Sequence, residues 1–228
     1  MDLVYYGHSC FGVTIAGKKL VFDPFVTPNE LTRGVVKLEN IHADYIFLSH
    51  GHQDHVADAV QLARSTGATV IANWEIHEWL QQQGISHTHP MNTGGKRDFG
   101  PFQVKCVNAL HSSGLPDGSY GGNPMGFILL SPQGNFYYSG DTGLSMEMQL
   151  IPRWAKLNFA VLPIGDNFTM DAADAAQCAE WIQCKQIVGV HYDTFGYITI
   201  QHDAARKAFA EKGITLHLLK IGETQTFI

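Results

Sequence analysis

The sequence predicts an α/β protein of one domain, residues 1–228, in which two packed sheets carry helices on their outer faces as a four-layer αββα sandwich. Short strands come first, strands then alternate with helices, and this order recurs loosely in the second half of the chain. Neither a linker nor a block of charge separates the two halves. Hydrophobic residues make up 45% of the chain, which is enough for a core of ordinary size.

The first half begins with short strands and continues with helices between strands. Runs of aromatic and β-branched residues are separated by Gly7 and by Ala16-Gly17, as expected of strands joined by tight turns. Val56, Val60 and Ala63 recur at helical spacing in a later segment. We expect strands over residues 3–6, 11–15, 19–22, 45–48 and 69–72. We expect helices over residues 54–64 and 74–83.

The second half is richer in strands and turns. The tetrapeptide Pro-Gln-Gly-Asn at 132–135 is typical of a tight hairpin turn. Residues 112–124 hold glycines and prolines throughout and predict an exposed loop, either a mobile flap or a long connection. We expect strands over residues 102–107, 126–130, 136–138, 159–163, 187–190 and 216–219. We expect helices over residues 172–182 and 201–211.

Composition excludes several classes of protein. With 15 basic and 21 acidic residues the net charge is −6, which disfavours broad binding to a nucleic acid backbone. No apolar run reaches about 18 residues, so we expect no membrane span. No basic segment followed by an apolar stretch opens the chain, and the 4 cysteines form no CxxC pair. These features favour a cytoplasmic protein with reduced thiols and a small-molecule substrate, and they leave self-association into a homo-oligomer open.

The strongest chemical signal is His50-Gly51-His52-Gln53-Asp54-His55, which follows a predicted buried strand. His50 and His52 share a face of an extended loop because alternate residues point the same way. Asp54 and His55 come where the chain turns into a helix, so they can face the same space from another side. A polar loop with Asp54 as a helix cap would leave the three histidines unexplained. The segment therefore predicts a metal site.

Three further candidates each follow a predicted strand. His111 comes after the strand at 102–107, Asp141 after the strand at 136–138, and His191 after the strand at 187–190. Functional residues of sheet proteins collect at strand ends of this kind. Each would be read alone as a surface residue, but together with the His50–His55 motif they indicate a shared metal site.

This order of residues resembles the metallo-β-lactamase superfamily, and the whole chain fits one domain of the metallo-β-lactamase fold. Shorter motifs are similar to the metal-dependent hydrolase branch that includes L-ascorbate-6-phosphate lactonase. They are Gly-His-Ser-Cys-Phe at 7–11, Phe-Asp-Pro at 22–24, residues 163–170 and His-Tyr-Asp-Thr-Phe at 191–195. His52 stands where a redox di-iron branch has Glu, and Asp141 where true β-lactamases have Cys. The resemblance therefore implies hydrolysis rather than redox chemistry or antibiotic cleavage.

The resemblance also implies a division of the seven ligands. His50, His52 and His111 would hold one divalent ion; Asp54, His55 and His191 would hold a second; and Asp141 would bridge them. These donor types suit zinc or manganese, with iron and nickel as alternatives. Two such ions about 3.5–4 Å apart would share a water, lower its pKa to near neutrality and provide the nucleophile.

Further residues are candidates for roles other than metal binding. His8 follows the first strand and could give a proton to the leaving group, so we group it with Asp54 as a catalytic candidate. Asp23 could accept a hydrogen bond from a ligand histidine and fix its tautomer. Near the predicted ligands, Asp166, Asn167 and Tyr192 are candidates for contact with the substrate or with the ligands.

The sequence thus predicts a metal-dependent hydrolase that uses a hydroxide activated by two metal ions to cleave an ester-like bond. Lactones, phosphodiesters and thioesters are the candidate substrates. The alternatives are a metal-binding sensor or scaffold without catalysis, and a small nuclease that processes RNA.

Overall fold

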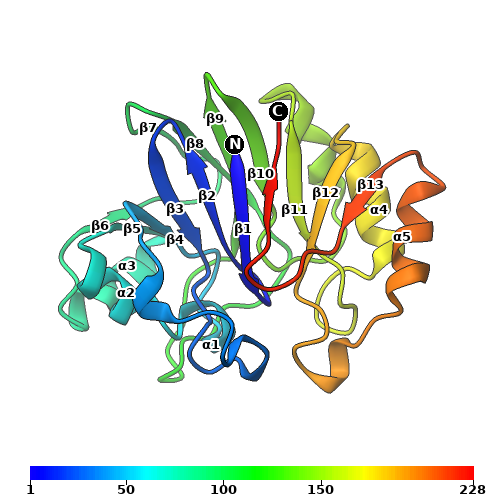
Figure 1. Cartoon of the computed structure of the whole chain (residues 1–228). Helices are drawn as coiled ribbons and strands as arrows, with labels where there is room; N and C mark the ends of the chain where they lie inside the picture. The colour runs from blue at the N-terminus through cyan, green and yellow to red at the C-terminus, as the bar shows by residue number, and fades with distance from the viewer.

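The computed structural model describes residues 1–228 and contains two seven-stranded sheets packed face to face (Figure 1). In the order of its strands, the first sheet consists of β14 (Thr224–Thr226), β1 (Asp2–Gly7), β2 (Cys10–Ile15), β3 (Lys18–Phe22), β4 (Tyr45–Phe47), β5 (Thr69–Ala72) and β6 (Thr88–Pro90). The second consists of β13 (Thr215–His217), β12 (Gln186–Val190), β11 (Phe159–Pro163), β10 (Gly134–Tyr138), β9 (Met125–Ser131), β8 (Gln103–Asn108) and β7 (Lys96–Asp98).

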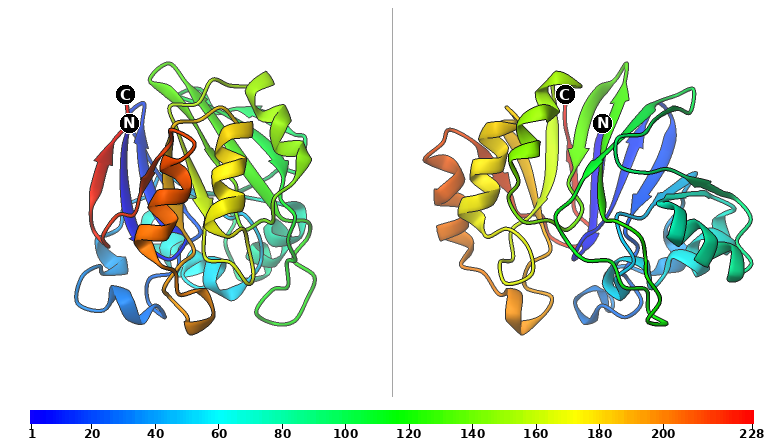
Figure 2. Two further views of the ribbon diagram at one scale, coloured as in Figure 1. Left: turned by 90° about the vertical axis from the view of Figure 1, so that its right-hand side faces the viewer. Right: turned by 180° about the vertical axis from the view of Figure 1, so that it is seen from behind.

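Helices cover the outer face of each sheet, so the predicted four-layer sandwich is confirmed. The helices near the first sheet are α1 (Gln53–Val56), α2 (Ala59–Thr66) and α3 (Trp74–Gln82), with the 3-10 turns η1 (Glu30–Thr32) and η2 (Leu38–Asn40). Those near the second are α4 (Ala172–Trp181) and α5 (His202–Ala210), with η3 (Met146–Arg153) and η4 (Gly196–Ile198). Figure 2 shows α4 and α5 lying side by side over the second sheet.

Three buried clusters hold the layers together. The cluster between the sheets is aromatic: Phe22 stacks on Phe11 and Phe47 with ring centroids 4.6 and 4.7 Å apart, and Phe136 stacks on Phe159 at 4.8 Å. Two further clusters join each sheet to its own helices. Buried apolar area of this extent is the main source of stability in such a sandwich. None of the helices combines the length and the apolar character needed to cross a membrane.

The predicted helix over 54–64 is wrong as a single element, because α1 and α2 are separated at Ala57 and Asp58. Asp58 is only 3% exposed, and its carboxylate accepts hydrogen bonds from the backbone N–H of Val26 and Thr27, at 2.6 and 2.8 Å. The helix is interrupted here because the Asp58 carboxylate turns toward these two backbone N–H groups. The strands β6, β7 and β14 were not expected, because each has three residues and a largely polar sequence.

Strand direction explains where the predicted site residues meet. Strands β3 and β4 are parallel, as are β10, β11 and β12. Strands β1 and β8 run the same way as these neighbours, because each is separated from them by one antiparallel strand. The carboxyl ends of all seven strands therefore lie at one edge, the lower one in Figure 1, where α1 also lies.

Candidate metal centre

Three site residues leave their strands through a left-handed turn. His8, Asp23 and His191 follow β1, β3 and β12 and have φ values of 55, 41 and 56°. This region disfavours side chains other than those of Gly, Asn, Asp and His, so the surrounding structure holds these residues in place. The turns direct the three side chains toward the same space between the sheet ends.

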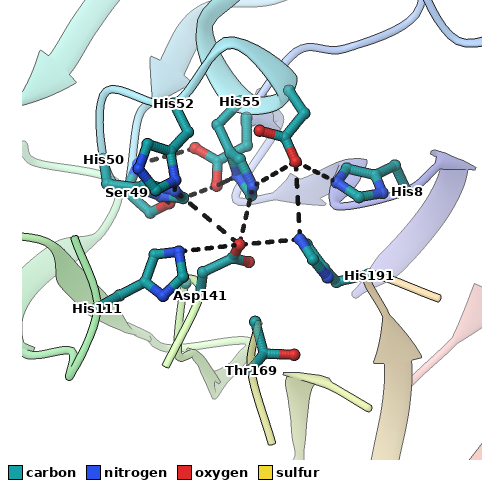
Figure 3. A network of polar contacts seen from close by, with 12 residues as sticks. His8, Ser49, His50, His52, His55, His111, Asp141, Thr169 and His191 are labelled. Carbon is teal, nitrogen blue, oxygen red and sulfur yellow. Dashed lines mark hydrogen bonds and ion pairs between the residues drawn. The ribbon is translucent and has the colours of Figure 1, made fainter. Parts of the chain in front are cut away.

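One carboxylate oxygen lies at the centre of the site. Asp141 Oδ2 is 3.0 Å from His191 Nε2, 3.2 Å from His55 Nε2, 3.7 Å from His111 Nε2 and 3.9 Å from His50 Nε2. Figure 3 shows these four imidazoles turned toward Asp141. Asp141 is 2% exposed and stands between both sets of predicted ligands, which is the place a bridging carboxylate would need.

The first predicted set is brought together by the loops after β4 and β8. Ligand atoms of His50, His52 and His111 lie within 4.8 Å of one another. The Ser49 hydroxyl donates to Asp23 and therefore accepts from His50 Nδ1, at 2.9 Å. This leaves His50 Nε2 as an unprotonated nitrogen 2.9 Å from His52 Nδ1. Two neutral imidazole nitrogens facing one another are suited to a shared cation.

The second predicted set lies on the other side of Asp141. Ligand atoms of Asp54, His55 and His191 lie within 4.8 Å of one another, and His8 belongs to the same group. The His8 Nε2–H donates to Asp54 Oδ2 at 2.9 Å, and its Nδ1 accepts from the Thr194 hydroxyl at 3.0 Å. Burial lowers the pKa of His8 to about 4 although the hydrogen bond to Asp54 opposes it, so this ring is neutral near pH 7.

Asp23 forms hydrogen bonds that orient residues of both predicted sets. Its Oδ2 accepts from His55 Nδ1 at 2.8 Å, and from the Ser49 and Tyr138 hydroxyls at 2.5 Å each. Its Oδ1 accepts from the Ser49 backbone N–H at 2.8 Å. The sequence prediction that Asp23 fixes the tautomer of a ligand histidine agrees with this geometry. Because Nδ1 of His55 is the donor, Nε2 points into the site as an acceptor.

The arrangement fits divalent cations. His55 Nε2 and Asp141 Oδ1 are buried without a hydrogen-bond partner. The His55 nitrogen faces Asp141 Oδ2 at 3.2 Å and Asp54 Oδ2 at 3.6 Å. A lone pair facing two carboxylate oxygens is stable only with a positive charge among them. Histidine nitrogens with two carboxylates are also the ligands that zinc, manganese and iron share.

The pKa shifts show that protons can take the place of that charge. Burial lowers the pKa of both His55 and His191, but Asp141 and Asp54 outweigh it. The pKa of His55 therefore lies well above its usual range, and that of His191 rises to about 9. Burial raises the pKa of Asp54 and Asp141, but the neighbouring imidazoles hold both well below their usual range. The metal-free site is thus a cluster of paired charges.

A first prediction concerns the protons that metal binding displaces. Since the pKa of His191 is about 9 without metal, this ring is protonated at pH 7, and a cation must displace that proton. We expect at least one proton to be released at the second set at pH 7, and apparent affinity to rise with pH at least as far as the pKa of His191, about 9. Titration calorimetry of zinc in buffers of different ionisation enthalpy measures this release. Equal heats in all buffers would contradict it.

The loop after β8 lies over the His50–His55 segment. Gly51 N–H donates to the Ser113 hydroxyl at 2.9 Å, and the Ser112 hydroxyl lies 3.2 Å from His52 Nε2. A side chain at Gly51 would touch Leu115. The base of the glycine-rich loop is therefore packed against the site, although residues 116–120 are exposed.

Three residues that were predicted to contact the substrate or the ligands form no hydrogen bond with the predicted ligands, and a contact with the substrate stays a prediction. Tyr192 is 7% exposed and packs in the cluster between the second sheet and its helices, so its side chain faces away from the site. Asp166 and Asn167 are exposed in a left-handed turn, and the Asp166 carboxylate accepts from the Asn167 backbone N–H at 2.7 Å. Thr169 of the same loop is drawn below Asp141 in Figure 3, and its hydroxyl donates to the Met170 carbonyl rather than to a predicted ligand.

Several supporting residues were given no specific partner by the sequence. Thr194 reaches His8 across 186 positions of sequence, and Tyr138 reaches Asp23 across 115. Gly165 is required because a Cβ there would clash with the carbonyl oxygen of His191. Gly165 and Thr194 had a visible signal, since they lie in the 163–170 and 191–195 motifs that follow predicted strands, whereas Tyr138 had none.

Comparison with known proteins agrees with the fold and identifies the family. Residues 18–192 match the Beta-lactamase superfamily domain. A UPF0173 metal-dependent hydrolase from Christiangramia forsetii is 48% identical over 98% of this chain and 99% of its own length. The UPF0173 metal-dependent hydrolase YtkL from Bacillus subtilis is 40% identical over 98% and 99%.

Solved structures give the same result. Igni18, a metallo hydrolase from the archaeon Ignicoccus hospitalis, superposes with a TM-score of 0.89 at 31% identity, over 98% of this chain and 97% of that one. An isothiocyanate hydrolase from Delia radicum gut bacteria shares the fold, with a TM-score of 0.80 at 19% identity over 100% and 99%. The chain therefore belongs to the beta-lactamase superfamily and to its metal-dependent hydrolases.

Proposed function

We propose that this protein is a hydrolase with two metal ions that cleaves an ester-like bond, in a lactone, a phosphodiester or a thioester. The observation that carries the proposal is the position of Asp141 Oδ2, which lies within 3.9 Å of imidazole nitrogens from both predicted ligand sets. A mononuclear site has no need for a second set of histidines and a shared carboxylate.

The ligands would be His50, His52 and His111 for one ion and Asp54, His55 and His191 for the other, with Asp141 between them. Zinc or manganese suits these donors best, and iron and nickel are alternatives. When bound, the ions supply a water of lowered pKa and stabilise negative charge that develops on the substrate. The site does not require a Ser or Cys nucleophile.

The protein's own groups orient the reacting partners. Asp54 is 24% exposed, the most open of the carboxylates here, and it is held by His8 through Oδ2. We assign to Asp54 the role of accepting a hydrogen bond from the attacking water. The role of His8 as a proton donor to the leaving group stays a prediction. Its burial and its two hydrogen bonds favour a role in positioning Asp54.

A reconstitution experiment tests the proposal. The protein is stripped of metal, titrated with zinc or manganese, and assayed against a lactone, a thioester, bis-p-nitrophenyl phosphate and single-stranded RNA. We expect turnover to rise with metal, to saturate at two equivalents, and to be lost in His111→Ala but kept in His42→Ala, an exposed histidine elsewhere. Two bound equivalents with no turnover would indicate a sensor or scaffold, and cleavage of RNA alone would indicate a nuclease. Saturation at one equivalent would contradict the binuclear proposal.

The bond type, the substrate class and the location of the protein are proposals as well. The motifs that resemble the L-ascorbate-6-phosphate lactonase branch suggest a lactone among the three bond types. A small-molecule substrate and a cytoplasmic location agree with the acidic charge of −6 and with the composition.

A further inference from the structure

Exposed apolar side chains gather beside the metal centre. Four of them form what we call the apolar rim: Leu110, Phe168, Phe195 and Tyr197, which are 62, 50, 39 and 78% exposed. All four lie on loops that follow β8, β11 or β12, at the same edge as the predicted ligands. Exposed apolar residues gathered at one place on a surface usually mark a binding site.

Contacts join the rim to the site. The Phe195 ring lies 5.3 Å from the ring of His8, which holds Asp54, and 6.3 Å from the ring of Phe25. The Phe168 and Tyr197 rings meet edge to face at 6.1 Å. The rim thus lies next to the second predicted ligand set.

The other end of the rim lies beside Asp141. Leu110 precedes His111, and its backbone N–H donates to the Thr142 hydroxyl at 2.9 Å. The turn that carries Phe168 is joined to the same place, because Met170 N–H donates to the Thr142 carbonyl at 3.0 Å. The segments that carry the four side chains therefore follow the metal centre from His111 to His8.

Basic side chains are missing from the same loops. Residues 48–58, 108–125, 139–150, 163–172 and 191–201 contain no lysine or arginine. The loop after β3 carries Arg33 and Lys37, and Arg33 is paired with Glu30 at 2.7 Å. Several of these loops instead carry acidic residues, among them Asp117, Glu147 and Asp166. A phosphate held by these five loops at a distance from the reacting bond would find no lysine or arginine there, although recognition of phosphate normally uses Arg or Lys.

We infer that the substrate is an uncharged molecule that carries an apolar or aromatic group next to its ester-like bond, such as an alkyl- or aryl-substituted lactone or thioester. The same reasoning disfavours phosphorylated sugars and nucleic acids as substrates. This inference rests on the proposed function and narrows its substrate class. The rim supplies apolar contact to the substituent, while the metal centre acts on the bond.

The experiment compares three γ-lactones in the zinc-loaded protein: one with a phenyl substituent, one unsubstituted, and one with a phosphorylated hydroxymethyl group. The same substituents are tested on aryl thioesters. We expect kcat/KM to be about 10-fold higher for the phenyl compound than for the unsubstituted one, and lowest for the phosphorylated one. A preference for the phosphorylated compound would overturn the inference.

Variants of the rim test where the preference arises. Phe195→Ala and the double variant Phe168→Ala, Tyr197→Ala should raise KM for the phenyl lactone about 10-fold and leave the unsubstituted one within 2-fold. Trp154→Ala is the matched control, because Trp154 is 39% exposed but follows η3 at the other end of the second sheet. Equal losses on all three lactones would assign the rim a purely structural role. A change in oligomeric state with unchanged KM would assign it to a protein partner. Either result overturns the inference.

Binding separates failure of the inference from failure of the proposed function. γ-Lactams with the same three substituents serve as uncleaved probes in calorimetry. Tighter binding of the phenyl lactam, lost in Phe195→Ala, would support the inference even if no lactone or thioester is cleaved. Turnover of all substrates with no preference in cleavage or in binding would leave the hydrolase in place and remove the inference.

Discussion

Asp141→Asn is expected to abolish activity almost completely and to weaken binding of both metal ions. The amide keeps the size of the carboxylate but carries no charge, and it cannot bind two cations through one oxygen. Replacing a group that only supports a metal ligand typically lowers activity or metal affinity by about 10–100-fold, so loss of the central ligand should reach about 10³-fold in kcat/KM. Metal content by elemental analysis, together with steady-state kinetics, checks this prediction.

The variant should also change the metal-free protein. The pKa of His55 and of His191 is lowered by burial and raised mainly by Asp141, so both should fall when its charge is removed. NMR titration of the imidazoles measures this change. Asp203→Asn is the control, because the Asp203 side chain is fully exposed and its only ion pair, with Arg206, is long at 3.6 Å. Two tightly bound ions in Asp141→Asn would rule out the bridging role.

Asp23→Ala should have the largest effect on stability. It leaves four donors around one fully buried site without an acceptor: the Ser49 N–H and hydroxyl, the Tyr138 hydroxyl and His55 Nδ1. Truncating a buried group of this kind costs about 3–5 kcal/mol. For a chain of this size each kcal/mol corresponds to about 2–4 °C in Tm, so thermal unfolding should show a large decrease.

Two milder variants separate the causes. Asp23→Asn tolerates the φ of 41° and keeps one acceptor oxygen, so it should be destabilised less than the alanine variant. Its weaker acceptor should still lower metal affinity by about 10–100-fold, because His55 loses its fixed orientation. Tyr138→Phe removes a single donor and should leave metal affinity nearly unchanged. Equal metal affinity in the wild type and Asp23→Asn would mean that Asp23 serves stability alone.

The sequence predicted the fold and the seven candidate ligands because both depend on local patterns. His50, His52, Asp54 and His55 form one motif, and His111, Asp141 and His191 each follow an apolar strand. Parallel strands place such positions at one edge whatever their separation along the chain. The spacing of these residues was therefore sufficient to predict that they meet.

Other features depend on contacts between distant segments and left no local pattern. The break between α1 and α2 arises because Asp58 binds the backbone at Val26 and Thr27. The motif at 191–195 contains Thr194, but its partner His8 is identified only when the loop after β12 folds back onto the end of β1. For Tyr192 the local pattern was misleading. It is the neighbour of the predicted ligand His191 in sequence, but its side chain points to the other face of the chain.

The ligands are divided between the two sheets in a way that has a mechanical consequence. His50, His52, Asp54 and His55 follow β4 of the first sheet, whereas His111, Asp141 and His191 follow strands of the second. Each ion would therefore cross-link the two sheets, because its ligands come from both. Cation binding then resists separation of the layers, and at a free concentration about 100 times Kd it adds about 2.7 kcal/mol for each ion. Chelation would remove this cross-link and leave the aromatic cluster between the sheets as the main interaction that holds the layers together.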